Sequence, residues 1–401
     1  MPTSTLPIAF KKLLLVIFTI TLCSCGKRNS IATKYTSAQD TLIVSTQKHK
    51  GPGLFAIGSR TVEFENNPDV YDYHLQLPKN MDSIQKTRLA IDFKAKPLEY
   101  IDIISGYINH KNVFIVDANH NKDLTDDEVH LWKAMEWDNP KDLAACNFKI
   151  SDGKQMVDGY SWLNMGIYNS EYKIGKSEYL TAKVTIDNDA FTLGFAEPRN
   201  FSSFYCQGFD TVAALLVNGM VKKDSLTEND IVYKNEYFNL NGKYYRFAGI
   251  TNNGDKITLI RENNFNTKLG SQIGMLAPAF TCVTTKGDTI NSSSAQNSFK
   301  IIANSCGCGG DTASDKASDA ITDLYKDKAF VLHLDSGKGD SNSNRSVDTQ
   351  QTFNKDLYNS FRGQYCSRIC YVIDKNNRII DKFDVTDWKN HLPKLFGSFG
   401  K

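Results

Sequence analysis

Residues 299–311, FKIIANSCGCGGD, join a short apolar run to two cysteines that stand one residue apart. An apolar run of this length, bounded by Asn, Ser and Gly, is typical of a buried strand in a parallel sheet. From Thr312 onward, small and apolar side chains recur every three or four residues, which predicts the core-facing side of a helix. Cys306 and Cys308 are therefore expected at a turn between a strand and a helix.

Residues 328–335, KAFVLHLD, supply the next apolar run. The three segments together predict a unit of strand, crossover helix and parallel strand. Ligands and chemistry gather at the carboxyl ends of such strands, and a helix N-terminus favours the thiolate form of a cysteine placed there. His333 lies within the second strand, where we expect a hydrogen-bonded packing role for it.

A second cysteine pair stands in residues 364–374, QYCSRICYVID, at the start of another apolar run. If the chain is extended from residue 366, then Cys366, Arg368 and Cys370 share a face, because alternate residues of a strand do so. A guanidinium between two sulfur atoms would favour their thiolates. We expect these cysteines to form one site with Cys306 and Cys308; the alternative is a surface disulfide or two small buried side chains.

These segments resemble the thioredoxin-fold proteins of the TlpA and AhpC/TSA group, as found in the envelopes of Bacteroidetes-type bacteria. The resemblance covers residues 269–401 and rests on four segments in the same order: GMLAPAFTCVTTKGD, FKIIANSCGC, FVLHLDSG and CYVIDKNNRIIDKF. It implies a thioredoxin-like α/β domain at the C-terminus. It also implies thiol-disulfide exchange with protein thiols or disulfides of the cell envelope as partners.

The chain departs from the family pattern at its centre. Cys306 and Cys308 enclose a single Gly where the family has two residues, Ser305 stands in place of Trp, and Arg368 occupies the position of the family's cis-proline. Residues 302–305, directly before Cys306, contain neither the Pro nor the Thr that a peroxidase of this fold requires, which argues against peroxidase chemistry. Clustered thiolates also suit copper(I) or zinc, but a nearby guanidinium disfavours a bound cation.

The first 25 residues have the pattern of a signal peptide. Lys11 and Lys12 precede an apolar run at 13–22 that is too short to span a bilayer. The run ends in Leu-Cys-Ser-Cys, which resembles a bacterial lipobox with Cys25 as the lipidated residue. This predicts a lipid-anchored protein of the bacterial cell envelope, and the basic Lys27 and Arg28 that follow Gly26 favour a periplasm-facing site.

Composition places limits on the remaining sequence. The 401 residues suggest two or three domains, and a formal net charge of +2 argues against a nucleic-acid partner. Nine cysteines are present, of which seven follow Cys25, and an exported protein can form disulfides. An odd number leaves at least one free thiol.

Residues 26–40 are polar and are predicted to be a tether. From residue 41 to residue 266, alternating apolar and polar runs separated by Gly, Asn and Asp predict a β-rich, sandwich-like region. Residues 113–132 and 213–234 align with one inserted residue, which indicates a weak internal repeat of two related β units. The thioredoxin-like domain then covers residues 267–401.

The first copy of the repeat contains a turn with the ligand spacing of a calcium loop. Positions 1, 3, 5, 7, 9 and 12 of that loop are Asp117, Asn119, Asn121, Asp123, Thr125 and Glu128. Lys122 replaces the usual glycine, and the two Asn ligands reduce the charge, so any calcium binding should be weak. The second copy lacks these ligands, and the alternative is therefore a turn that needs no metal.

Two functions remain open from the sequence. The first is an oxidoreductase without a required cofactor, in which Cys306 attacks a partner disulfide and Cys308, Cys366 or Cys370 resolves the mixed disulfide. The second is a binding or scaffold lipoprotein of the same fold, whose disulfides are structural.

Overall fold

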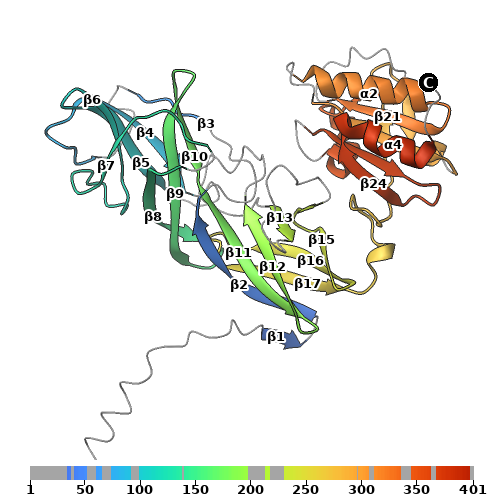
Figure 1. The fold of residues 1–401 in the computed structure, drawn as a ribbon, viewed down its shortest axis with the longest axis horizontal. Coiled ribbons are helices and arrows are strands. Elements are labelled where there is room, and N and C mark those ends of the chain that lie inside the picture. Colours follow the sequence, from blue (N-terminus) through green and yellow to red (C-terminus); the bar gives the residue numbers. More distant parts are fainter. Residues whose placement is uncertain are drawn as a thin grey trace, which may run out of the picture.

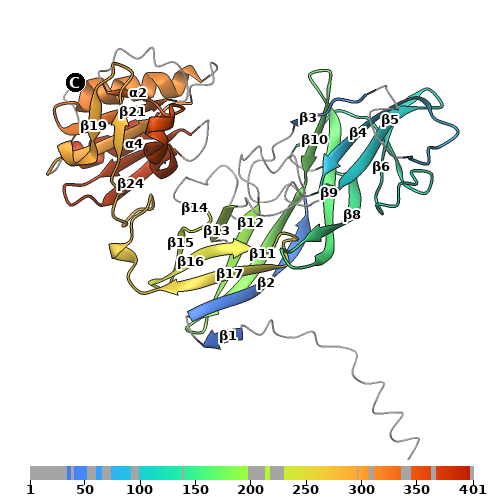
Figure 2. The same ribbon diagram turned by 180° about the vertical axis from the view of Figure 1, so that it is seen from behind.

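Two parts of different architecture make up the chain in the computed structural model, a strand-rich N-terminal region and a C-terminal α/β domain (Figures 1 and 2). The residues that the structure describes are 34–37, 40–51, 60–65, 74–91, 99–137, 140–196, 213–216, 230–295, 297–306, 311–335, 345–362 and 367–397. Among them, no helix has the length and apolar character needed to cross a membrane.

Two four-stranded antiparallel sheets form a sandwich in the N-terminal region. One sheet has the order β3 (Arg60–Thr61), β10 (Glu171–Lys176), β9 (Met156–Tyr168), β8 (Leu143–Ser151). The other has the order β4 (Asp82–Ala90), β5 (Tyr100–Ile108), β6 (Lys111–Val116), β7 (Val129–Leu131). Alternate residues of β8 are buried, and the inner faces of both sheets share one apolar core, which includes Ile103, Phe114, Phe148 and Leu163.

A larger antiparallel sheet follows the sandwich. Its strand order is β14 (Ile231–Val232), β13 (Ala213–Leu216), β12 (Asp189–Ala196), β11 (Glu178–Ile186), β2 (Asp40–Lys50), β17 (Lys256–Glu262), β16 (Lys243–Ile250), β15 (Tyr237–Leu240), and β1 (Lys34–Ser37) pairs with β2. Residues from both halves of the sheet, among them Leu193 and Phe247, belong to one core. The sheet therefore curls, and its two end strands are consecutive in the chain.

The sandwich-like, β-rich region agrees with the sequence prediction, with two differences in detail. The predicted tether at 26–40 overlaps β1, because residues 34–37 pair with the first residues of β2. Both copies of the predicted repeat contain an antiparallel strand pair, β6 with β7 and β13 with β14. Most of the second loop, residues 217–229, lies outside the described residues.

The C-terminal domain contains a five-stranded sheet of order β22 (Ser346–Asp348), β21 (Ala329–Asp335), β20 (Phe299–Asn304), β23 (Ile369–Ile373), β24 (Ile379–Asp384). β20 and β21 are parallel, with helix α2 (Thr312–Tyr325) between them in the chain, and β23 and β24 are an antiparallel hairpin beside β20. A parallel βαβ unit extended by such a hairpin is the thioredoxin-like arrangement that the sequence predicts.

Short elements complete this part of the chain. They are the strands β18 (Thr281–Val283) and β19 (Thr289–Asn291), the helices α3 (Lys355–Leu357) and α4 (Trp388–Phe396), and the single turns η4 (Phe265–Thr267), η5 (Ser292–Ala295), η6 (Thr352–Asn354), η7 (Tyr358–Arg362) and η8 (Val385–Asp387). α2 and α4 contribute Ile321 and Leu392 to the core on one face of the sheet, beside Ile301 of β20. Asp311 caps α2 by accepting a hydrogen bond from the Ser314 amide, which explains why the helix begins at residue 312.

Candidate functional site

Cys306 lies where the sequence places it, between the carboxyl end of β20 and the first turn of α2. Only 5% of the residue is exposed. Its backbone N–H donates to Ser314 Oγ at 3.0 Å, and this hydroxyl donates in turn to the Asp311 carbonyl at 3.1 Å. The backbone of Cys306 is thereby tied to the start of the helix. Its predicted partner Cys308 lies outside the described residues.

A buried polar layer fixes the strand end beneath Cys306. The Asn304 side-chain amide donates to the carbonyls of Phe361 at 2.9 Å and Ile369 at 2.8 Å. The Arg362 guanidinium donates to the Ser305 carbonyl at 3.0 Å and to Asn304 Oδ1 at 3.3 Å. Arg362 is itself buried, with 3% of the residue exposed. Sequence reasoning missed both residues. A polar Asn at the end of the apolar run was the one signal available, and nothing in the sequence marked Arg362.

His333 also belongs to this layer, in keeping with the packing role expected for it. Its Nε2 lies 2.7 Å from Ser305 Oγ, and 2% of the residue is exposed. Nδ1 is buried and has no hydrogen-bond partner among the described residues. Burial lowers the pKa of His333, and the nearby Arg362 guanidinium acts in the same direction. The imidazole is therefore held neutral one residue away from the cysteine.

Arg368 does not have the role that strand parity suggests. Its guanidinium contacts Asp311 Oδ2 at 3.4 Å and Asp384 Oδ1 at 3.1 Å, so its charge is balanced by carboxylates. Cys370 is fully buried in β23 opposite Ala303, and burial raises the pKa of its thiol well above the ordinary value. The prediction that Arg368 favours the Cys370 thiolate is therefore wrong, because desolvation dominates. Cys366 lies outside the described residues.

The four cysteines that the structure describes are Cys146, Cys282, Cys306 and Cys370, and all are buried. Cys146 lies in the core of the sandwich and Cys282 in that of the C-terminal domain. Burial raises the pKa of Cys146 to about 12 and that of Cys282 to about 11, which suits structural side chains. The proposed lipidation residue Cys25 lies outside the described residues, as does Cys206.

In the first half of the predicted calcium loop, backbone amides of the loop donate hydrogen bonds to the carboxylate of Asp117. Asp117 is fully buried, and its two oxygens accept the backbone amides of Asn121 and Lys122, each at 3.0 Å. Lys122 has φ 66°, the left-handed conformation for which such loops prefer glycine. Asn119 Oδ1 also accepts from the Asn121 amide at 3.0 Å. The turn therefore has the predicted shape despite the lysine.

The second half of the loop fits a cation less well. Asp123 Oδ1 accepts both the amide and the hydroxyl of Thr125, at 3.0 and 2.6 Å. The Glu128 side chain is 81% exposed and lies 3.9 Å from His130, outside the loop. Within the described ranges, no group of three or more His, Cys, Asp or Glu side chains is arranged to hold a metal ion. Calcium binding therefore stays a prediction.

No protein-family model matches this sequence, and no curated protein matches it significantly. Several solved structures do match in part. The thioredoxin domain of a thiol-disulfide oxidoreductase from Bacteroides vulgatus is 18% identical, covering 31% of this chain and 96% of that chain, with a TM-score of 0.23. An exposed lipoprotein thioredoxin from Streptococcus pneumoniae is 16% identical, covering 30% and 100%, with a TM-score of 0.21. The mitochondrial 2-Cys peroxiredoxin from Plasmodium falciparum is 14% identical, covering 32% and 99%, with a TM-score of 0.23.

Proposed function

We propose that the C-terminal domain carries out thiol-disulfide exchange with Cys306 as the nucleophile. The observation that carries this proposal is the position of Cys306, at the carboxyl end of the central strand and tied to the first turn of α2. The unpaired amides at a helix N-terminus stabilise a thiolate, and the thiolate is the attacking species. The Arg362 guanidinium donates to the Ser305 carbonyl and the Cys306 N–H donates to Ser314 Oγ, so both polar atoms of the peptide group before Cys306 are held in place.

The exchange conserves atoms and electrons in two steps. The Cys306 thiolate attacks one sulfur of a partner disulfide, and the partner's second sulfur leaves as a thiolate that takes a proton from water. A second thiol of this protein then attacks Cys306 Sγ and releases the partner's first sulfur. The partner disulfide gains two electrons, and two cysteines of this chain are oxidised to a disulfide.

The second thiol is better supplied by Cys308 or Cys366 than by Cys370. Cys370 is fully buried, and the raised pKa of its thiol leaves little thiolate at neutral pH. Its side chain also packs in the core beside Ala303 and Ile321, so attack would require that core to open. Cys370 is therefore assigned a structural role.

A second candidate function is a redox-inactive binding or scaffold protein. The observation in its favour is that only 5% of Cys306 is exposed, so a partner disulfide would need local opening to reach the sulfur. On this alternative, any bridge involving Cys308 or Cys366 is structural and resists reduction until the domain unfolds.

Differential alkylation with mass mapping across a graded series of dithiol redox buffers separates the two. Exchange predicts a bridge that opens and closes reversibly at the potentials of known exchange catalysts, and its loss in Cys306→Ser. Cys370→Ser should leave the bridge intact, and Cys146→Ser, in the N-terminal sandwich, is the matched control for a buried thiol. A bridge that persists in Cys306→Ser, or sulfurs that react only on unfolding, would reject the exchange proposal.

We also propose that the protein is anchored in the bacterial cell envelope through a lipid on Cys25, where disulfide-bearing partners occur. The support is the apolar run that ends in Leu-Cys-Ser-Cys. Expression in a bacterial host with radiolabelled palmitate should label the chain, and Cys25→Ser should remove the label and release the protein from the membrane fraction. Labelling that survives in Cys25→Ser would refute the anchor.

A further inference from the structure

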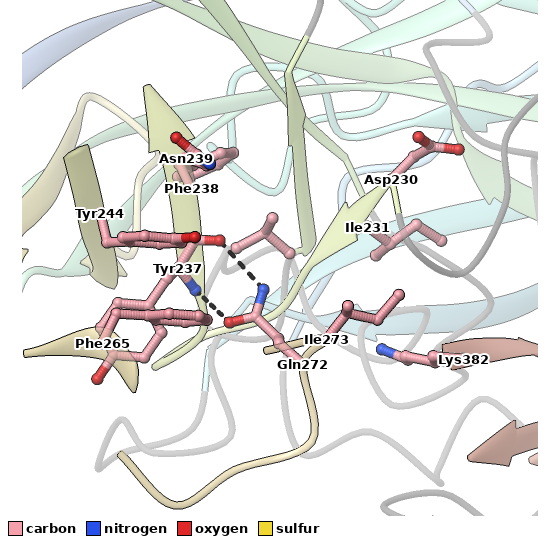
Figure 3. A pocket seen from close by; sticks show the side chains of 11 residues that line it. Asp230, Ile231, Tyr237, Phe238, Asn239, Tyr244, Phe265, Gln272, Ile273 and Lys382 are labelled. Atoms are coloured by element: carbon pink, nitrogen blue, oxygen red, sulfur yellow. Dashed lines mark hydrogen bonds between the residues drawn. The ribbon is translucent and has the colours of Figure 1, made fainter. Parts of the chain in front are cut away.

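A pocket of about 400 Å³ lies where the curled N-terminal sheet meets the C-terminal domain (Figure 3). Its walls come from the two end strands of the large sheet, β14 and β15, from the connection after η4, and from β24. Gln272 of the connection fixes one wall, because its side-chain amide accepts from the Tyr237 N–H at 2.7 Å and donates to the Tyr237 carbonyl at 3.1 Å. These two bonds extend the edge of β15 as another strand would.

One side of the pocket is aromatic. The rings of Tyr244 and Phe265 stack with centroids 3.8 Å apart and planes 1° apart, and Tyr237 meets Phe265 edge-on at 5.3 Å. Ile273, 42% exposed, and Ile231 add aliphatic surface across from these rings (Figure 3). Such a lining buries a flat or branched apolar group, while the few polar side chains set the orientation of a ligand.

The distinctive polar group is Lys382 of β24. Only 3% of this residue is exposed, yet no ion pair or hydrogen bond of its ammonium group is found among the described residues. Its Nζ lies over two aromatic rings, 5.9 Å from the centroid of Tyr233 and 6.0 Å from that of Tyr371. Figure 3 shows the side chain extending from β24 with its nitrogen toward Ile273 and Gln272. An ammonium group at the wall of a pocket, with no counter-ion among the described residues, attracts an anion, so the site is suited to an incoming one.

We infer that this pocket binds a monocarboxylate with an apolar body, its carboxylate on the Lys382 ammonium and its body against Tyr244 and Phe265. Among the described residues, the lining contains one cationic and one anionic side chain, Lys382 and Asp230, so a singly charged anion fits better than a phosphate. The carboxylate belongs either to a free organic acid or to the C-terminus of a peptide. The inference does not rest on the exchange chemistry at Cys306.

Isothermal titration of the full chain in detergent micelles tests the inference with four probes: phenylacetate, phenylacetamide, the peptide Ala-Gly-Phe and its C-terminal amide. At least one carboxylate probe should bind, with its amide at least tenfold weaker. If phenylacetate binds as well as the peptide, the site takes free acids; if only the peptide binds, it takes chain ends. No heat from either carboxylate up to 10-millimolar concentrations, on the order of the weakest useful affinities, would overturn the inference.

Two variants keep the result interpretable. Lys382→Met preserves the length of the buried side chain and should weaken the carboxylates at least tenfold, without an effect on the amides. Ile273→Glu changes a partly exposed side chain, so it should fold, and its carboxylate should compete for Lys382 and abolish binding. The matched control is Lys389→Met, an exposed lysine of α4, which should bind as the parent does. If Lys382→Met or Ile273→Glu binds the carboxylate probes as tightly as the parent does, the pocket is not their binding site and the inference is overturned.

Discussion

At the scale of single residues, a neutral imidazole and a guanidinium support the proposed nucleophile, Cys306, from inside the domain. The His333 imidazole contacts the Ser305 hydroxyl, and the Arg362 guanidinium contacts the Ser305 carbonyl. Both side chains therefore hold the residue just before Cys306. Each comes from a different element, β21 and η7. Burial of these polar groups is tolerated because each forms hydrogen bonds, and the loss of a partner would leave a buried group unsatisfied.

The buried imidazole makes stability depend on pH. Burial lowers the pKa of His333, whereas the carboxylates of Asp335, Asp319 and Asp315 oppose this and Arg362 adds to it. In the unfolded chain the imidazole binds a proton below about pH 6.5, but in the folded chain it does so only at lower pH. The contribution of the neutral His333 imidazole to the free energy of unfolding is therefore complete above about pH 6.5. It is lost as the pH falls from this value toward the lower pKa of the folded state.

We accordingly expect the C-terminal domain to lose stability between pH 7 and pH 5, and His333→Gln to show a flatter pH dependence. Hydrogen exchange of the β20 and β21 amides, corrected for intrinsic rates, measures this free energy. At pH 8, where the parent imidazole is neutral in both states, the variant should differ only through its altered contact with Ser305. Parallel pH curves for the two proteins would contradict the assignment.

At the scale of the element, the loop between β6 and β7 is stabilised chiefly by Asp117. Its carboxylate accepts two backbone amides and allows the left-handed conformation of Lys122. A buried acceptor that satisfies two amides contributes about 1–3 kcal/mol once the unsatisfied partners are counted. These two bonds shape the first half of the loop, and metal binding would require the exposed Glu128 side chain to turn inward.

Two effects at this loop can be separated by calorimetry. Asp117→Ala should lower the free energy of unfolding of the sandwich by roughly 1–3 kcal/mol in the absence of metal. Calcium at millimolar concentrations, on the order of weak extracellular sites, should raise the melting temperature of the parent but not that of Glu128→Gln. If the parent melts at the same temperature with and without calcium, the loop is a turn that binds no calcium. If Asp117→Ala unfolds with the same free energy as the parent, the stabilising role of the carboxylate is contradicted.

At the scale of the whole molecule, the junction between the β-rich region and the C-terminal domain is built by a few side chains of the connection. Gln272 pairs with the edge strand β15, and the Arg378 guanidinium donates to the carbonyls of Asn266, at 3.1 Å, and Gly274. The pocket around Lys382 exists only while these contacts hold the parts together. Its shape therefore depends on the junction and not on either part alone.

Gln272→Ala should accordingly loosen the junction. The variant loses two hydrogen bonds, and the one that protects the Tyr237 amide is worth about 1 kcal/mol, so exchange of this amide should be roughly fivefold faster. Native-state hydrogen exchange with peptide mapping measures this rate. Gln351→Ala, which removes an exposed side-chain bond to Asp348, is the matched control and should leave Tyr237 unchanged. An unaltered rate in Gln272→Ala would mean that the junction is held by other contacts.

The sequence by itself determined the elements around the cysteines. The apolar run at 299–304, the helix from residue 312 and the following strand were all predictable, because strand length, helical spacing and capping are properties of neighbouring residues. The alternating pattern of the N-terminal region likewise predicted antiparallel sheets, although it did not predict how the large sheet curls.

Only the tertiary structure decided the surroundings of the site. Asn304 meets the carbonyl of Phe361, 57 positions away, and Arg362 meets Asn304, 58 positions away. Strand parity placed Arg368 and Cys370 on one face, but parity does not reveal that Arg368 pairs with carboxylates or that Cys370 is desolvated. Charge balance and burial are set by residues that are distant in the chain, and local pattern carries no information about them.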